Sequence, residues 1–364
     1  MSARPSGPVA HDGSVPDPAT RRLADLGWRA DLEDHFARWA ADGCLPGRVA
    51  RVDRGLATVQ TGDGPLRVPL SRRAAPPAVG DWIAVRLASD GTAEVAAVLP
   101  RRSAFVRHGA GETTSEQVLA ANVDTVLLVN ALNTRLNLRR IERYLALGWQ
   151  SGASPVVVLT KADLCDDVPA AVAAVEVVAL GVPVHAVSTV TGDGMDAVAR
   201  YARPGATLAL LGLSGVGKST LANHLAGRAL LRVSDVRADG KGRHTTTHRE
   251  LVVLPRGGVL IDTPGMRGLL LWDSAEGVEQ SYPDVEELAA SCRFADCAHA
   301  SEPGCAVRAA LRDGRLPVAR LESYRKLQRE LRFLEIKQDA RARSDERRRY
   351  RAMNRQLRQQ ARGG

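Results

Sequence analysis

The stretch GLSGVGKS at residues 212–219 decides the fold of this 364-residue chain. It follows the apolar run TLALL at 207–211, which predicts a buried strand, and leads into STLANHLAG at 219–227, which predicts a helix. The three glycines of the stretch allow backbone torsions that a side chain would forbid, so successive N–H groups can point at phosphate oxygens. The dipole of the following helix favours the same anion, and the sequence therefore predicts a phosphate-binding loop.

The residues of this loop have distinct expected roles. Lys218 reaches the β- and γ-phosphates, which also makes it a catalytic candidate, and Ser219 supplies a hydroxyl ligand to Mg²⁺. The other residues expected to contact the nucleotide here are Gly212, Ser214, Gly215, Val216, Gly217 and Thr220. The alternative interpretation is a glycine-rich turn that binds nothing.

A second nucleotide motif, DTPG at 262–265, ends the apolar run GVLID. Asp262 is therefore expected at the end of a strand, where its carboxylate can hold Mg²⁺ through water, and the Gly265 amide can meet the γ-phosphate. By itself, a strand that ends in this tetrapeptide is more often an ordinary turn. Its place after a phosphate loop favours the functional interpretation.

A third motif, TKAD at 160–163, follows the apolar run PVVVL and predicts the base that is bound. The Asp163 carboxylate can accept two hydrogen bonds from guanine N1–H and the N2 amino group, and adenine offers no such donor pair. The Lys161 stem can lie over the purine plane. Thr160 stands where Asn is commoner, and the backbone at Ser188, in HAVST, is expected to touch the guanine oxygen.

Between the phosphate loop and DTPG lies the threonine-rich segment GKGRHTTTHRE at 240–250. Such a segment suits a switch loop, in which one threonine hydroxyl joins the Mg²⁺ shell only when the γ-phosphate is present. Spacing does not decide among Thr245, Thr246 and Thr247, and we favour Thr246 or Thr247. The alternative is a polar surface loop.

The three motifs occur in a rotated order along the chain. An ordinary GTPase domain begins with the phosphate loop and reaches the base-reading motif last, whereas here TKAD comes first. Strand and helix patterns alternate from Asn122 to about Gly265, which predicts a mostly parallel, doubly wound sheet with the motifs at the carboxyl ends of its strands. The predicted fold class is α/β, with a circularly permuted P-loop GTPase domain.

The motif order TKAD, VST, GLSGVGKS, GRHTTTH, DTPG resembles that of the circularly permuted ribosome small-subunit-dependent GTPase A family (RsgA, also called YjeQ), as does NVDTVLLVNALN with NLRRIERYLAL before it. The similarity covers roughly residues 45–360. It implies a GTPase that binds the small ribosomal subunit and its rRNA, acts late in the maturation of that subunit, and hydrolyses GTP faster when the subunit is bound.

The residues that would catalyse hydrolysis are the least evident from the sequence. Conventional GTPases often place a water-orienting Gln just after the Gly of the third motif, and here that residue is Met266. An apolar side chain cannot orient water, so slow intrinsic hydrolysis is expected. His248 matches the switch histidine of the family and is expected to position water, unless it only anchors the loop. Thr247 is the remaining catalytic candidate.

A separate constellation, Cys292, Cys297, His299 and Cys305, lies within SCRFADCAHASEPGC. Three thiolates and one imidazole form a tetrahedral zinc set with no open position, which indicates one structural zinc. Three of the five cysteines of the chain fall within fourteen residues, and this clustering favours the metal over buried unpaired cysteines.

Five short β-like runs between Gly47 and Ser103 predict a small barrel, with an OB-fold as the natural candidate. Its arginines would give it a basic surface for RNA, whereas Trp82 is expected in its core. Those arginines are Arg48, Arg51, Arg54, Arg67, Arg72 and Arg73. The predicted organisation is a largely disordered extension at 1–40, the barrel at 45–105, the permuted GTPase domain at 115–275, a zinc-binding helical domain at 276–340 and a basic tail at 341–364.

The net charge of +9 is concentrated at the C-terminal end. From Arg320 to Gly364 there are fifteen Arg or Lys and six Asp or Glu, an excess equal to that of the whole chain. A charge run is usually a solvated face, but beside a barrel and a zinc module it favours binding to ribosomal RNA. No signal peptide or membrane-spanning run is present, so we expect a cytoplasmic monomer with no membrane partner.

Two other classes of function are also compatible with parts of the sequence. An ATP-dependent small-molecule kinase would use the same phosphate loop but would not need Asp163. A nonhydrolysing RNA-binding scaffold would keep the barrel and the zinc module around a structural nucleotide. Competition between GTP and ATP, and multiple-turnover phosphate release, distinguish these from the GTPase.

Overall fold

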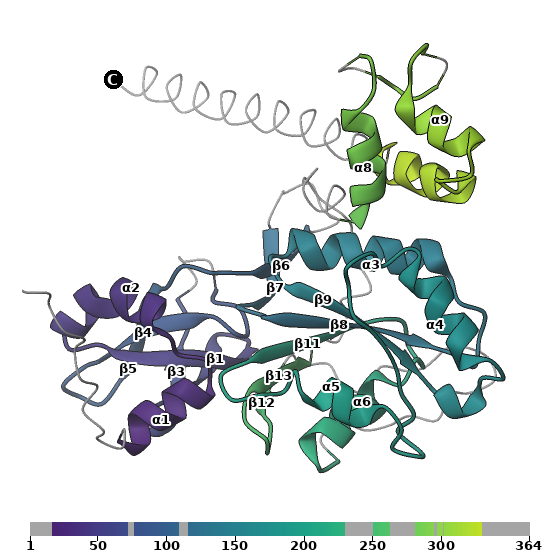
Figure 1. The fold of residues 1–364 in the computed structure, drawn as a ribbon. Coiled ribbons are helices and arrows are strands. Elements are labelled where there is room, and N and C mark those ends of the chain that lie inside the picture. Colours follow the sequence, from purple (N-terminus) through teal and green to yellow (C-terminus); the bar gives the residue numbers. More distant parts are fainter. Residues whose placement is uncertain are drawn as a thin grey trace, which may run out of the picture.

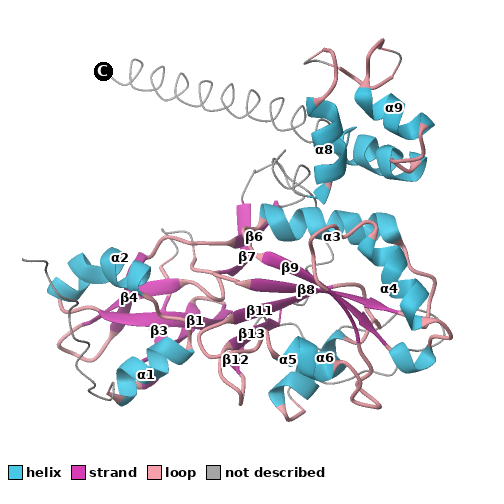
Figure 2. Cartoon of the chain, viewed as in Figure 1, coloured by secondary structure: helices cyan, strands magenta, loops and turns pink. Residues whose placement is uncertain are grey.

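The computed structural model describes residues 17–71, 76–108, 116–229, 250–262, 281–294, 297–300 and 302–329 (Figure 1). The predictions for Thr246, Thr247, His248 and Gly265, and that for the tail at 341–364, lie outside these residues. Figure 2 shows how helices and strands alternate through the central part of the chain.

One continuous sheet runs through the described part of the molecule. The part predicted to be the GTPase domain, called the GTPase half below, has the strand order β10 (Val184–Ala186), β9 (Ser154–Thr160), β8 (Thr125–Ala131), β11 (Thr207–Leu211), β13 (Val259–Asp262) and β12 (Glu250–Val253). The first five strands are parallel, and β12 is antiparallel to β13. Strands covered on both faces need apolar side chains throughout, which explains the continuous apolar runs in the sequence.

Both faces of this parallel sheet are covered by helices. The four helices are α3 (Leu138–Gln150), α4 (Val168–Glu176), α5 (Met195–Ala199) and α6 (Lys218–Ala226). α3 and α4 lie on one face, and α5 and α6 on the other (Figure 1). Because successive strand residues point to opposite faces, Val126 and Leu128 of β8 pack in the core with α3, whereas Leu127 and Val129 pack in the core with α6.

The predicted barrel is present and has the strand arrangement of an OB-fold. Its strands are β1 (Leu45–Asp53), β2 (Leu56–Thr61), β3 (Gly64–Pro69), β4 (Trp82–Leu87) and β5 (Ala93–Val98). β1 pairs with β2 and β4, the pairs β2–β3 and β4–β5 follow, and β3 lies close to β5. The ring is therefore a small five-stranded barrel filled by side chains such as Val59 and Ile83.

The barrel and the GTPase sheet are joined through β1. This strand pairs antiparallel with β12, with Arg51 opposite Glu250. The barrel therefore extends the same sheet that carries the nucleotide motifs. A separate two-stranded sheet, β6 (Ala104–His108) with β7 (Glu116–Ala121), lies along the chain between the barrel and β8.

The expectation of a largely disordered extension at 1–40 is wrong for its second half. Two helices, α1 (Pro18–Asp25) and α2 (Ala30–Ala41), pack on the barrel side of the molecule. Asp17 caps α1 by accepting from the Ala19 amide at 2.8 Å, and proline suits the first helical position. Leu32 and Phe36, four residues apart, are buried, so α2 is held by an apolar stripe that the proline- and glycine-rich start of the chain does not share.

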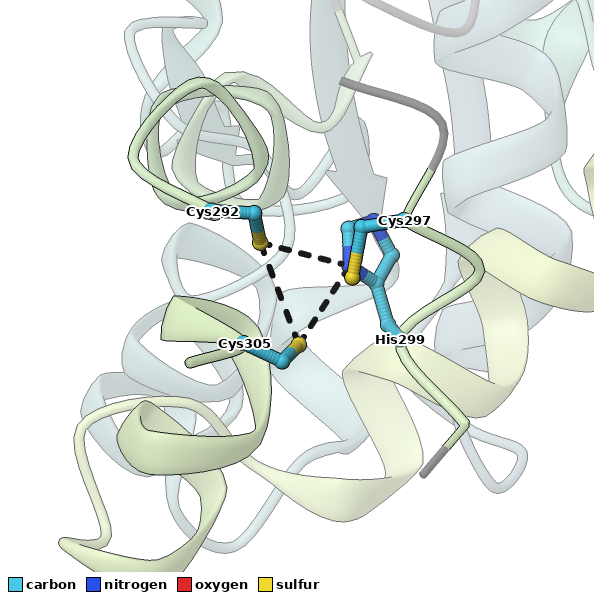
Figure 3. Close-up of side chains that lie close together, drawn as sticks. All are labelled: Cys292, Cys297, His299 and Cys305. Carbon is cyan, nitrogen blue, oxygen red and sulfur yellow. Dashed lines mark hydrogen bonds between the residues drawn. The ribbon is translucent and has the colours of Figure 1, made fainter. Parts of the chain in front are cut away.

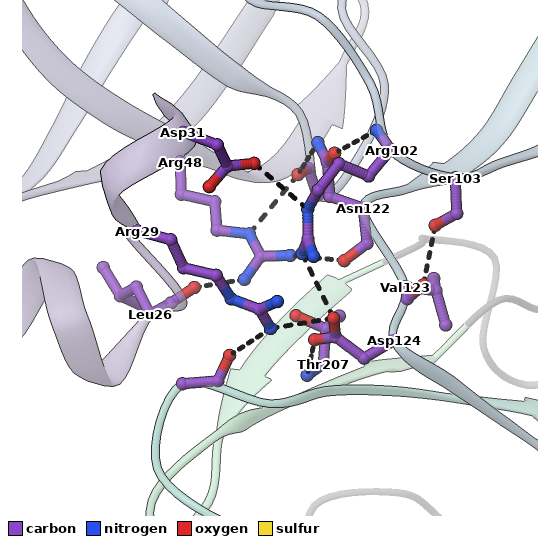
Figure 4. A network of polar contacts seen from close by, with 12 residues as sticks. Leu26, Arg29, Asp31, Arg48, Arg102, Ser103, Asn122, Val123, Asp124 and Thr207 are labelled. Atoms are coloured by element: carbon purple, nitrogen blue, oxygen red, sulfur yellow. Dashed lines mark hydrogen bonds and ion pairs between the residues drawn. The ribbon is translucent and has the colours of Figure 1, made fainter. Parts of the chain in front are cut away.

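Arg48, expected on an RNA-binding surface, is instead buried at 1% exposure. Its guanidinium donates to the carbonyl oxygens of Leu26, Gly80 at 3.3 Å and Asn122 at 3.1 Å (Figure 4). Burial lowers its pKa to about 9. The α1–α2 connection covers this face of β1, and the strand pattern alone does not reveal that cover. Trp82 is 1% exposed, which confirms its expected place in the core.

The contacts around Arg48 continue into the GTPase half through Asp124. This carboxylate accepts from Arg29 at 2.8 Å, from Arg102 at 3.1 Å and from the backbone amide of Thr207 at 2.8 Å (Figure 4). Asp124 precedes β8 and Thr207 begins β11, so this polar network lies at the amino ends of the parallel strands.

The C-terminal region is helical, as predicted. It contains α8 (Pro283–Ala290), α9 (Ala306–Arg312) and helical residues 318–329. Arg320 fixes it to the GTPase half by donating to Glu142 of α3 at 2.9 Å and to Asp284 of α8 at 2.9 Å. The boundaries given for the domains stay predictions. Within the residues that the structure describes, we find no helix with the length and apolar character needed to span a bilayer.

Candidate functional site

The described nucleotide motifs meet at one edge of the parallel sheet. Thr160 ends β9, Ser188 follows β10, Gly212 follows β11 and Asp262 ends β13. These strands are parallel neighbours through β8, so their carboxyl ends lie side by side. In open α/β sheets this edge is where ligands bind.

The phosphate loop depends on its glycines for its shape. Gly215 and Gly217 have φ angles of 77° and 92°, in the left-handed region that favours glycine. A Cβ on Gly212 would lie 2.3 Å from the Val129 carbonyl oxygen, so no side chain fits there. Gly217 is also the residue before the first turn of α6, and the loop therefore presents its amides at a helix N-terminus.

Lys218 lies over the loop that it follows. Its Nζ donates to the carbonyl oxygens of Gly212 at 2.9 Å and Leu213 at 2.6 Å. Burial raises the pKa of Asp262, and the nearby Lys218 charge acts in the opposite direction. The ammonium of the loop and the carboxylate at the end of β13 are therefore within electrostatic reach of each other, as a shared phosphate and metal site requires.

The base-reading motif is organised by its contacts with the residues after β10. Asp163 Oδ1 accepts from the Ser188 hydroxyl at 2.6 Å, and the Ala162 amide donates to the Val187 carbonyl at 3.1 Å. Lys161 has a φ of 59°, which turns the chain sharply at the end of β9. Ser188 was predicted for its backbone alone, and the role of its hydroxyl in orienting Asp163 has no local signal in the sequence.

Thr160 joins the base-reading motif to the phosphate loop. Its hydroxyl lies 2.6 Å from the Val216 carbonyl oxygen and 3.2 Å from that of Asn130. Thr160 is 2% exposed, so this contact is inside the protein. The substitution of Thr for the commoner Asn therefore keeps a polar link to the loop. TKAD and GLSGVGKS, separated by some fifty residues of chain, touch directly.

Asn130 lies near the site but belongs to none of the three nucleotide motifs. It is 4% exposed near the end of β8, and its side-chain amide donates to the Leu128 carbonyl at 3.2 Å. A lone amide in the apolar run VDTVLLVNA is the signal that could have revealed it. The backbone carbonyl oxygen of Asn130 faces the Thr160 hydroxyl, so the end of β8 supports the link between the two motifs.

The four predicted metal ligands come together in the C-terminal region. The ligand atoms of Cys292, Cys297, His299 and Cys305 all lie within 4.8 Å of one another (Figure 3). Cys292 follows α8, and Cys305 caps α9 by accepting from the Arg308 amide at 3.4 Å. The two short helices thus carry ligands into one cluster.

The distances within the cluster fit a tetrahedral ion. The Sγ atoms of Cys292 and Cys305 are 3.8 Å apart, and His299 Nδ1 lies 3.6 and 3.5 Å from them. A tetrahedron with metal–sulfur bonds of about 2.3 Å has sulfur–sulfur edges of about 3.8 Å. Burial, and then the Arg325 charge, lower the pKa of His299, which favours the neutral imidazole that binds metals. The cluster could therefore hold a metal ion.

The backbone at His299 is specially held. Its φ of 57° is uncommon for a residue other than glycine, and Arg325 donates to its carbonyl oxygen at 2.5 Å. Groups behind metal ligands commonly fix ligand orientation in this way. The helix at 318–329 therefore supports the cluster from outside.

Comparisons with known proteins agree with this geometry. Residues 98–272 match the model of the family described as RsgA GTPase. A Streptomyces coelicolor protein named small ribosomal subunit biogenesis GTPase RsgA is 51% identical over 346 residues, covering 90% of this chain and 92% of the relative. A protein of the same name from Opitutus terrae is 48% identical, covering 85% of this chain and 89% of the relative.

Solved structures support the fold. The crystal structure of YjeQ from Thermotoga maritima matches with a TM-score of 0.60 and 27% identity, covering 79% of this chain and 98% of that one. A structure described as YloQ, a circularly permuted GTPase, matches with the same TM-score at 23% identity, covering 79% and 95%. The predicted fold class, with its permuted order of motifs, is confirmed, whereas the roles of individual site residues stay predictions.

Proposed function

Because the chain belongs to the RsgA GTPase family and is therefore a GTP hydrolase, we propose that it binds the small ribosomal subunit and hydrolyses GTP during the late maturation of that subunit. Relatives of about half identity are named small ribosomal subunit biogenesis GTPase RsgA. The observation that carries the proposal is the Thr160–Val216 contact, which brings a guanine-reading carboxylate and a phosphate-binding loop to one edge of the sheet.

Different residues of the site contact different parts of the nucleotide. Asp163, oriented by Ser188, accepts from the guanine edge, and the Lys161 stem covers the purine face. The amides around Gly215 and Gly217 surround the β-phosphate, and Lys218 leaves the loop carbonyls to meet the β- and γ-phosphates. The Gly265 amide completes this contact with the γ-phosphate.

Two metal ions suit the donor sets of the chain. The Ser219 hydroxyl and the Asp262 carboxylate would hold Mg²⁺, together with Thr246 or Thr247, and the ion when bound neutralises charge on the transferred phosphoryl group. The Cys₃His cluster has the donor set of a structural zinc site. Its role is to fold the region between α8 and α9, and it takes no part in the chemistry.

Hydrolysis depends on how water is oriented. Met266 occupies the position where many GTPases carry a glutamine, so intrinsic turnover is slow. His248 then positions the attacking water, and the bound subunit stimulates the reaction. Thr247 and Lys218 complete the catalytic set.

The partner is the small subunit through its rRNA. The exposed arginines of the barrel and the C-terminal excess of positive charge suit an RNA backbone. We infer a monomer that works in the cytoplasm, where ribosomes are assembled.

The test is hydrolysis of GTP and ATP, each with and without purified small subunits. We expect multiple-turnover phosphate release from GTP and not from ATP. The rate of release from GTP should increase markedly when subunits are added. Equal use of ATP would favour a kinase-type site, and single-turnover release would favour a scaffold with a structural nucleotide. A GTPase rate that stays the same when small subunits are added would contradict the proposed partner.

A further inference from the structure

A hollow of about 430 Å³ lies between α3 and the helix at 318–329, and none of its lining residues belongs to a nucleotide motif. Four cationic side chains line it, and we call it the basic hollow; they are Arg139, Arg140, Arg143 and Lys326. None of these residues belongs to the nucleotide site, the barrel or the metal cluster.

The acidic residue in the lining does not offset this charge. Glu142 accepts from Arg320 at 2.9 Å, and both side chains are at most 3% exposed. Glu142 is thus already neutralised inside the protein. Arg139 pairs with Glu322 at 3.1 Å, but both side chains are more than half exposed, and such pairs contribute little. Glu142 is therefore not available to neutralise the cations that line the basic hollow.

The position of two of these cations conflicts with the electrostatics of the helix. Arg139 and Arg140 lie in the first turn of α3, where the helix dipole disfavours positive charge, and that turn contains no acidic residue. Asn137 caps the helix by accepting from the Arg140 amide at 3.1 Å. A local conflict of this kind, in an otherwise well-formed helix, points to a function for the charges.

Arg140 supplies a further observation. Its Nε atom is buried and has no hydrogen-bond partner among the residues that the structure describes. Buried donors in native proteins are nearly always satisfied, so the described residues leave the Arg140 guanidinium incompletely paired. Cations, the amino end of a helix and an unpaired donor together suit a phosphate group.

We propose that the basic hollow binds the phosphodiester backbone of the RNA in the small subunit, an inference that rests on the proposed function. The hollow is larger than one phosphate needs, and four cations suit successive phosphates of a strand. The helix that forms one wall leads into residues 330–364, which carry eleven Arg or Lys and five Asp or Glu. The chain therefore continues to carry an excess of positive charge beyond the helix that lines the hollow.

The experiment compares two double variants of the full chain, each with two positive charges fewer. Arg140→Gln with Arg143→Gln alters the basic hollow. Arg200→Gln with Arg256→Gln alters exposed arginines near α5 and in the β12–β13 turn, on the other side of the sheet. Small-subunit affinity is measured for both and for the unaltered chain across a series of salt concentrations, with the melting temperature as a check on folding.

We expect the basic-hollow variant to bind subunits about tenfold more weakly at moderate salt. The slope of log affinity against log salt should fall by about 0.7–0.9 for each phosphate that the variant no longer neutralises. The control variant keeps the affinity and slope of the unaltered chain. Lys326 is exposed, so Lys326→Gln gives a smaller effect in the same direction even if the double variant folds poorly.

Each other outcome overturns the inference. If the unaltered chain binds subunits but the basic-hollow variant matches the control, the hollow does not bind RNA while the proposed function stands. If the unaltered chain binds no subunits, the proposed function and this inference both fail. If inorganic phosphate raises the melting temperature of the unaltered chain alone while subunit affinity is equal in all variants, the hollow holds a free anion and not RNA.

Discussion

The two edges of the parallel sheet differ in what their polar groups contact. At the amino-end edge, Arg48 and Asp124 direct their hydrogen bonds to other groups of the protein. At the carboxyl-end edge, glycines hold backbone amides in a loop, and Lys218 rests on carbonyl oxygens of that loop. Polar groups that are satisfied within the chain therefore hold domains together, whereas groups gathered around a loop that excludes side chains serve a ligand.

The largest effect is expected at the amino-end edge. Arg48→Met removes the donor to three buried carbonyl oxygens, and we expect the free energy of unfolding to fall by about 3–5 kcal/mol. Denaturant titration measures it. Arg67→Met, at an exposed position of the same barrel, is the control and should change stability by less than about 0.5 kcal/mol. If the free energy of unfolding changes equally little in both variants, Arg48 does not have the structural role described.

A second prediction tests the carboxyl-end edge. Asp163→Asn replaces an acceptor of two guanine donors by an amide, and we expect GTP binding about 100-fold weaker with nearly unchanged stability. Titration calorimetry with GTP and with inosine triphosphate, which lacks the N2 amino group, measures the effect. The unaltered chain should prefer GTP, and the variant should lose that preference. Asp166→Asn, at an exposed neighbouring position, should behave like the unaltered chain.

A third prediction concerns the hydroxyl that joins the two motifs. Thr160→Val keeps the shape of the side chain but removes the hydroxyl that reaches Val216, and we expect about tenfold weaker GTP binding because a partly buried carbonyl of the phosphate loop loses its donor. Thr160→Ser restores the hydroxyl and should restore most of the affinity. If Ser and Val bind GTP equally, the hydroxyl does not join the motifs.

The smallest effect is expected at Ser188. Ser188→Ala removes the hydroxyl that orients Asp163, and we expect GTP binding to weaken about threefold to fivefold, since one hydrogen bond contributes about 1 kcal/mol. The same calorimetry measures it, and the preference for GTP over inosine triphosphate should persist. An effect as large as that of Asp163→Asn would mean that Ser188 contacts the base itself.

Each feature that could be predicted from the sequence is defined by residues that lie close together in the chain. The phosphate loop, TKAD and the Cys₃His set are each defined by a few neighbouring residues, and strand ends place the first two at one edge. The apolar stripe of Leu32 and Phe36 could have revealed α2, but the proline-rich residues before it set the expectation for the whole segment.

The features that were not predictable depend on contacts between distant segments. Arg48 lies in the run RVARV, where a charge in a strand normally marks a solvent face, and only the packing of the α1–α2 connection buries it. The Thr160–Val216 contact spans two strand ends that the permuted order separates. Neither the residue type nor the local hydrophobic period predicts which residues a distant segment will bury.

The pairing of β1 with β12 has a mechanical consequence. Arg51 lies opposite Glu250, which follows the threonine-rich segment directly in the chain, and β12 lies beside the strand that ends in Asp262. If RNA binding displaces the barrel, the pairing with Arg51 transmits the displacement to Glu250. A displacement of the barrel would therefore act, through this pair, on the strand that directly follows the threonine-rich segment in the chain.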